Sequence, residues 1–131
     1  MNQKFFGLLT IALGCVVLFS KSAHAQERHG FDRVPLSVAI GVNVAGTVAD
    51  LYTTNSALNR GAVEGFGAAA GSTSIGKVAA FRITTSGVFT VCSILLDREG
   101  HHTAARWLSF GAGGAGFAAA FHNTRVNSWA K

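Results

Sequence analysis

Charged residues are scarce in this chain of 131 residues. Asp, Glu, Lys and Arg together make up 13% of it, whereas the residues AVILMFWYC make up 49%. A typical soluble domain carries about 25% charged residues, so the composition argues against an ordinary soluble enzyme. A disordered chain is also excluded, because disorder requires low hydrophobicity and high charge. The length suffices for one domain, and the composition is typical of a small membrane protein.

Proline and cysteine are nearly absent as well. The single proline, Pro35, and the sixteen glycines fit neither collagen nor a proline-rich linker. The two cysteines are too few for a disulfide framework or a four-cysteine zinc site. Cys15 fits poorly as a lipoprotein cysteine, because the apolar run around it continues to Phe19. Cys92 lies in an apolar stretch, where a thiol behaves as a small apolar residue.

The N-terminus has the features of a signal peptide over residues 1–25. A short positive start precedes the apolar run Phe5–Phe19, and Ala23 and Ala25 are the small residues that signal peptidase accepts. We therefore predict cleavage after Ala25, which leaves a mature chain of residues 26–131. An uncleaved transmembrane helix is the alternative for this segment.

The mature chain contains three apolar stretches, at about 35–54, 77–96 and 103–122. Each approaches the ~20 mostly apolar residues that a membrane-spanning helix requires. We therefore expect an all-α fold, a helical membrane protein with three transmembrane helices after the N-terminal signal segment. Only fourteen residues separate Arg82 from Asp97 in the second stretch, and runs of that length also occur in soluble bundles. A secreted soluble helical bundle therefore stays open as an alternative.

Cleavage of the signal would place the mature N-terminus outside the cytoplasm, and three crossings would then place the C-terminus inside. The inner side would carry five Lys and Arg residues and the outer side four, which agrees weakly with the positive-inside rule. We predict a multi-pass protein of a bacterial inner (cytoplasmic) membrane, in contact with the lipid bilayer. Its basic residues are scattered, so nucleic acid is not an expected partner.

Two ionisable residues lie inside the apolar stretches. A charge inside a membrane is costly and is usually paired or functional. Asp50 and Arg82 each lie about four to five residues from the inner end of their stretch, so we expect them at similar depth. We predict an Asp50–Arg82 ion pair that fixes helix register, with a proton or ion relay as the alternative. Arg106 is expected close to an interface or in an ion pair.

Small residues cluster in the third stretch. Gly111, Gly113, Gly114 and Gly116 are predicted to pack against a neighbouring helix, because helices in lipid associate where small residues let backbones approach. Packing within one chain is favoured over a dimer interface. The G-x-x-x-G spacing also occurs at 61/65 and 67/71.

No motif fits a cofactor or a metal ion. Residues 71–78 nearly match a phosphate-binding loop, but Val78 stands where the magnesium-binding Ser or Thr is required. Residues 111–116 match a dinucleotide string, yet too little chain follows for the next strand and its acidic residue. The adjacent His101 and His102 lack the ligand set of a metal site. We therefore predict no catalytic residue, no metal and no cofactor, and hence a protein that is not an enzyme.

The mature chain contains four short motifs in sequence order: Asp50-x-x-Thr53-Thr54, Gly61-x-x-Glu64, Lys77 at the start of an apolar stretch, and His122-Asn123. Together they resemble a group of small bacterial three-helix inner-membrane proteins of unknown function. That group has Asn-Pro two residues after the glutamate, where this chain has Phe66-Gly67. The resemblance covers roughly residues 35–126 and implies a three-helix membrane fold with no known activity.

These features predict a small polytopic membrane protein with a structural or interaction role. Its protein partner would be a second copy of the chain or another membrane protein. The alternative is a small oligomeric transporter or channel subunit that uses Asp50 and Arg82.

Overall fold

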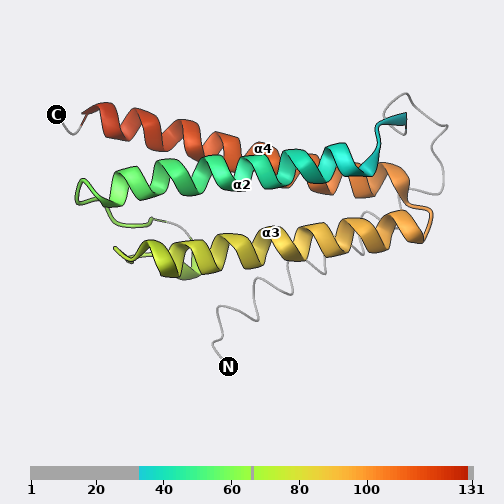
Figure 1. Cartoon of the computed structure of the whole chain (residues 1–131), viewed down its shortest axis with the longest axis horizontal. Coiled ribbons are helices and arrows are strands. Elements are labelled where there is room, and N and C mark those ends of the chain that lie inside the picture. The colour runs from blue at the N-terminus through green and yellow to red at the C-terminus, as the bar shows by residue number, and fades with distance from the viewer. Residues whose placement is uncertain (1–32, 66, 130–131) are drawn as a thin grey trace.

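The described part of the chain forms three long helices that lie side by side (Figure 1). The structure is a computed structural model and describes residues 33–65 and 67–129, with only the backbone for 126–129. The predicted signal segment and its cleavage point after Ala25 lie outside these residues. The elements are α2 (Leu36–Leu58), the short 3-10 helix η3 (Gly67–Ala69), α3 (Ile75–Arg98) and α4 (His102–Trp129), with no strand among the described residues. The all-α prediction is confirmed.

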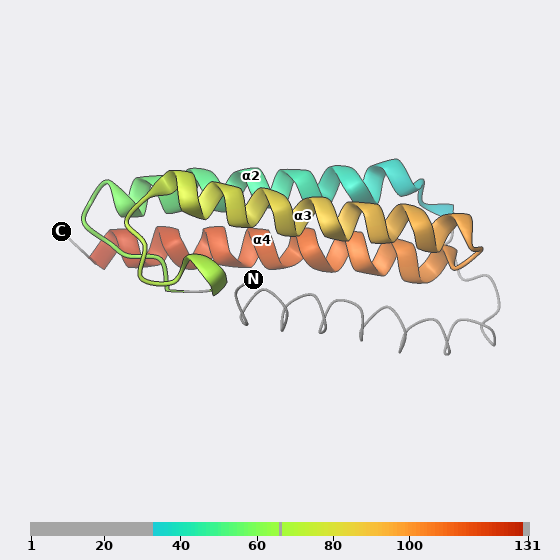
Figure 2. The ribbon, with the colours of Figure 1, turned by 90° about the horizontal axis from the view of Figure 1, so that it is seen from below.

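The ends of the helices follow local backbone chemistry. Pro35 precedes α2, and its carbonyl accepts hydrogen bonds from the N–H groups of Val38 and Ala39. Gly100 ends α3 with a φ of 85°, in the left-handed region that favours glycine. The N–H of His101 then donates to the carbonyl of Leu96 at 2.8 Å, so α3 and α4 form a tight helical hairpin (Figure 2).

The G-x-x-x-G spacings at 61/65 and 67/71 do not lie on the long helices α2, α3 and α4. Gly61, Gly67 and Gly71 all have positive φ and belong to the connection between α2 and α3. Their role is to turn the chain, which a residue with a Cβ does at a cost. These glycines therefore do not form a contact between two of the long helices.

The backbones of α2 and α4 touch each other. A Cβ atom at Gly46 would overlap the carbonyl of Gly113, and one at Gly113 would lie 2.5 Å from the carbonyl oxygen of Val42. A Cβ atom at Gly116 would lie 2.5 Å from the carbonyl carbon of Gly46. Close approach of this kind is the principal way in which helices associate in lipid.

The four glycines of α4 divide into two pairs. Gly113 and Gly116 pack on α2, as the sequence predicts, and Gly46 is their unpredicted partner. A Cβ atom at Gly111 or Gly114 would meet nothing within 4 Å. The packing prediction is therefore corrected for Gly111 and Gly114, which make no such contact with the rest of the described chain.

The distribution of side chains is the reverse of that in a soluble bundle. The buried apolar residues are mostly alanine, and the buried polar ones are Asn43, Asp50, Thr54, Glu64, Ser93, Arg106 and Ser109. Large apolar side chains are exposed instead: Val38, Val44, Val48, Tyr52, Val63, Ile75, Ile83, Val91, Leu95, Trp107, Phe117 and Phe121. Of the described helices, α2 and α3 are long and apolar enough to cross a membrane. Helix α4 does not meet the same criterion of length and hydropathy.

Candidate functional site

One face of α3 carries polar side chains at every turn. Arg82, Ser86, Thr90, Ser93 and Asp97 follow one another at spacings of four, four, three and four residues, which places them on one side of a helix. We call this row the polar seam. At 1.5 Å per residue it extends over about 22 Å. Each of its residues contacts a polar group on another part of the chain.

Three charged residues meet at one end of the polar seam. Arg82 Nε lies 3.0 Å from Asp50 Oδ2, and Arg82 Nη2 lies 3.5 Å from Glu64 Oε1. The distance between Arg82 Nε and Asp50 Oδ2 is that of an ion pair, but the two groups are not aligned for a hydrogen bond. Asp50 is 2% exposed and Glu64 is 8% exposed. The structure thus brings Asp50 and Arg82 together and adds a second buried carboxylate from the connection that follows α2.

Helix α4 joins the same cluster through one amide. Asn123 Nδ2 donates to Thr54 Oγ1 at 2.8 Å, and it lies 3.3 Å from both Thr53 Oγ1 and Asp50 Oδ1. Thr54 Oγ1 itself donates to Asp50 Oδ1 at 3.3 Å. The charge cluster, defined as Asp50, Thr53, Thr54, Glu64, Arg82 and Asn123, therefore links all three long helices.

Backbone hydrogen bonds in the connection hold Glu64 in place. The N–H of Glu64 donates to the carbonyl of Ser72 at 2.9 Å, and its carbonyl accepts from the N–H of Gly71 at 2.7 Å. The connection also lies against α3, because a Cβ atom at Gly67 would overlap the Phe81 ring. Glycine at 67 thus permits the close approach that brings the segment toward Arg82.

The residues marked by the resemblance to the group of small membrane proteins separate into three sets. Thr53, Thr54, Glu64 and Asn123 belong to the charge cluster. Gly61 turns the chain after α2, with a φ of 90°. Lys77 and His122 are exposed and make no contact with the cluster that the structure records.

Asn43 of α2 contacts the middle of the polar seam. It is 1% exposed, and its Nδ2 donates to the carbonyl of Ser86 at 3.2 Å and to Thr90 Oγ1 at 3.1 Å. Ser86 Oγ donates back to Asn43 Oδ1 at 3.2 Å. Both ends of the amide are therefore satisfied by α3, as a buried amide requires.

The far end of the polar seam ties α3 to α4. Ser109 Oγ donates to Ser93 Oγ at 2.8 Å between two fully buried residues. Arg106 Nη1 lies 3.0 Å from Asp97 Oδ1, and His102 Nδ1 lies 2.8 Å from the same oxygen. Arg106 also donates to the carbonyl of Val34, just before α2. The buried Arg106 is thus paired, which its position in an apolar stretch led us to expect.

The sequence predicts the charged pair but misses most of the polar seam. Asn43, Ser86, Thr90, Ser93 and Ser109 are each unremarkable as single polar residues in an apolar stretch. For the α3 residues of this set the common face is the usable signal, since five polar positions of α3 recur with helical spacing. Asn43 of α2 and Ser109 of α4 do not lie on that face.

The site offers ionic and hydrogen-bonding contacts between helices. Among the described residues, no group of three or more His, Cys, Asp and Glu side chains could hold a metal ion. Comparisons with known proteins found no matching family model, no matching curated protein and no matching solved structure.

Asn43→Ala is expected to lower the free energy of unfolding by about 1–2 kcal/mol, because three hydrogen bonds between helices are lost at roughly 0.6 kcal/mol each. Denaturant titration of the detergent-solubilised protein measures this difference. Asn55→Ala is the matched control, since Asn55 is exposed on the same helix. Equal stability of the two variants would contradict a stabilising role for Asn43.

Proposed function

We propose that this chain is a small multi-pass membrane protein with a structural or interaction role, not an enzyme. The observation that carries the proposal is the reversed distribution of side chains, with polar groups inside and large apolar groups outside. In water this arrangement would leave apolar surface exposed on every long helix, which stable soluble proteins avoid. In a bilayer it satisfies both the lipid outside and the polar groups inside.

The proposed topology has α2, α3 and α4 all crossing the membrane. The length and apolar composition of α2 and α3 are compatible with this topology. In α4, the residues from Trp107 to Thr124 carry no Asp, Glu, Lys or Arg. Arg106 at the start of α4 is paired with Asp97, which lowers the cost of placing it near the membrane boundary. A bacterial inner membrane, an outside N-terminus and an inside C-terminus complete the proposal.

Carbonate extraction of membranes tests the proposal. We expect the protein in the pellet, and recovery in the supernatant would favour the secreted soluble bundle. The intact mass of the extracted protein reports at the same time on cleavage after Ala25. A mass that matches the uncut chain would make the N-terminal apolar run a fourth helix.

Val48→Lys is expected to reduce the membrane-inserted yield severely. Val48 is 59% exposed near the middle of α2, where a lysine costs roughly 2.5–3.5 kcal/mol on insertion. On a soluble bundle the same exposed substitution would be nearly neutral. Val48→Leu is the matched control. Wild-type yield of Val48→Lys in the membrane fraction would contradict the proposed placement of α2.

The second candidate function is that of a small oligomeric transporter or channel subunit. The polar seam favours it, since about 22 Å of polar side chains is most of a hydrocarbon core of ~30 Å. Ion flux through reconstituted liposomes that is lost in Arg82→Gln would support this candidate. Ion flux equal to that of empty liposomes would contradict the transporter or channel candidate and leave the structural role as the proposal.

A further inference from the structure

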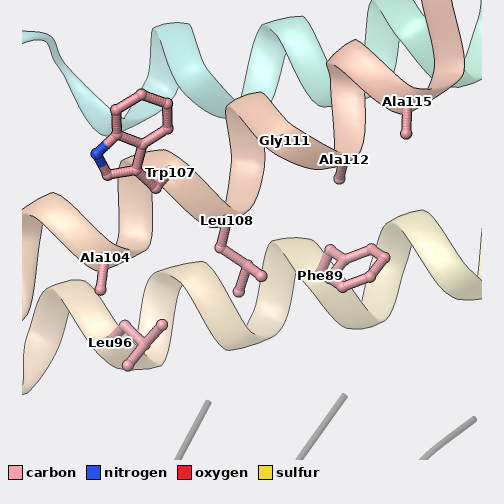
Figure 3. A pocket seen from close by; sticks show the side chains of 8 residues that line it. All are labelled: Phe89, Leu96, Ala104, Trp107, Leu108, Gly111, Ala112 and Ala115. Carbon is pink, nitrogen blue, oxygen red and sulfur yellow. The ribbon is translucent and has the colours of Figure 1, made fainter. Parts of the chain in front are cut away.

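An apolar groove runs between α3 and α4 on the outside of the bundle (Figure 3). Its volume is about 490 Å³, and its lining includes Phe89 and Leu96 of α3 and Ala104, Leu108, Gly111 and Ala115 of α4. Small residues on α4 leave this space open, because a Cβ atom at Gly111 would meet nothing within 4 Å. Trp107 and Ala112 of α4 complete the lining, and no ion pair recorded among the described residues involves a lining side chain.

We infer that this groove holds one acyl chain of a membrane phospholipid. The inference rests on the membrane insertion proposed above. The groove extends along α4 from Ala104 to Ala115, eleven residues or about 16 Å. One leaflet of a bilayer has a hydrocarbon thickness of about 15 Å, half of the ~30 Å core. The groove therefore reaches from one end of the bundle to its middle, as an acyl chain does.

The size and chemistry of the groove favour an acyl chain over a polypeptide as its occupant. A helix is about 10 Å wide, so it could not enter the groove whole and only side chains along one of its edges could occupy the space. An extended peptide would be slender enough, but its backbone N–H and C=O groups would find no partners on these apolar walls. A hydrocarbon chain is slender and has no polar group to satisfy.

The open end of the groove suits a lipid headgroup. It begins beside the connection from α3 to α4, where Arg98 is exposed in the last turn of α3. His102 is 56% exposed there, and Asp97 already pairs with Arg106. Glu99 is also exposed at this end, so the local charge is mixed. Arg98 supplies N–H donors for a lipid phosphate at the level where headgroups lie.

A photoreactive phospholipid tests the inference. The full-length protein is reconstituted in nanodiscs that contain phosphatidylethanolamine with a diazirine near the end of one acyl chain. After irradiation, mass spectrometry locates the cross-links. We expect at least threefold more labelling on the residues that line the groove than on the exposed face of α2 around Val44 and Val48.

Two variants of α4 form a matched pair for this test. Gly111→Leu introduces a side chain that fills the groove, and we expect the groove labelling to fall at least threefold. Gly114→Leu is the control. A Cβ atom at Gly114 also meets nothing within 4 Å, but Gly114 does not line the groove. A third variant, Ala112→Phe, fills the groove from the next lining position if Gly111→Leu does not fold.

Four outcomes would overturn the inference. Uniform labelling of all exposed apolar residues, or labelling unchanged by the groove-filling variants, would show an ordinary lipid-facing surface. Groove labelling that is lost when two copies of the protein share one nanodisc would assign the groove to an oligomer interface. These results leave membrane insertion intact. Recovery of the protein in the carbonate supernatant would instead remove the proposed function, and the lipid site with it.

Discussion

Gly113→Ala is expected to destabilise the protein, whereas Gly114→Ala, one position further along α4, is expected to stabilise it. At Gly114 the added methyl group meets nothing within 4 Å, so the higher helix propensity of alanine should raise stability by about 0.5–1 kcal/mol. At Gly113 the methyl group would lie 2.5 Å from the carbonyl oxygen of Val42 and 2.9 Å from the backbone nitrogen of Asn43. Backbone atoms inside a helix cannot rotate away as a side chain can.

The expected loss at Gly113 is about 3 kcal/mol, the upper end of the usual cost of overpacking. Relief requires that two helix backbones move apart along their contact. Such a loss lowers the folding equilibrium constant by roughly 150-fold, at a factor of ten per 1.4 kcal/mol. Denaturant titration in detergent measures both variants, and the opposite signs of the two changes are the decisive result.

A second pair of glycines provides an independent control on α2. Gly46 faces Gly113 and Gly116 across the helix contact, whereas Gly41 meets nothing within 4 Å. Gly46→Ala should therefore resemble Gly113→Ala, and Gly41→Ala should resemble Gly114→Ala. If all four substitutions changed stability in the same direction, the backbone contact between α2 and α4 would be disproved.

The glycines show what the sequence alone cannot decide. A stripe of small residues predicts a close helix contact, and the six residues 111–116 contain four glycines. Successive residues on a helix are rotated by about 100°, so those glycines cover more than one face. Only the position of α2 selects the face that carries Gly113 and Gly116.

The Asp50–Arg82 contact was predictable for a different reason. Antiparallel neighbouring helices share a common end, so counting residues from that end estimates the relative depth of two charges. Glu64 was beyond this argument, because it lies outside a regular helix. Its place beside Arg82 depends on hydrogen bonds to Gly71 and Ser72, whose pairing no helical or strand periodicity predicts. The resemblance to the group of small membrane proteins was the only sequence feature that marked Glu64.

Arg82→Gln is expected to destabilise the protein more than Asp50→Asn does. Removal of the guanidinium takes the Arg82 contact away from two buried carboxylates, Asp50 and Glu64. Removal of the Asp50 charge leaves Arg82 in contact with Glu64, and an asparagine at 50 can still hydrogen-bond to Thr54 and Asn123. Breaking a buried ion pair typically costs about 3–5 kcal/mol. We expect about 3 kcal/mol for Arg82→Gln, because its side chain is 21% exposed and solvent weakens the pair.

The double variant Asp50→Asn/Arg82→Gln separates pairing from independent roles. If the two residues stabilise the protein as a pair, the double variant should be more stable than Arg82→Gln alone, since only the Glu64 carboxylate then lacks the guanidinium contact. Recovery should be incomplete for the same reason. Lys77→Gln is the matched control, because Lys77 is an exposed cation near the same end of α3 and its loss should change stability by less than about 0.5 kcal/mol.

Membrane-inserted yield and denaturant titration of the four variants decide between two roles of the charge cluster. A favourable coupling energy of about 1 kcal/mol or more between Asp50 and Arg82 is the signature of a contact that holds α2 and α3 in register. Strictly additive losses would show that the residues act separately, even though Arg82 Nε and Asp50 Oδ2 lie 3.0 Å apart. Each charge would then be retained at a cost to stability without a gain from its neighbour, and intramembrane charges of that kind usually serve transport. Additive losses would therefore favour the transporter or channel subunit over the structural role.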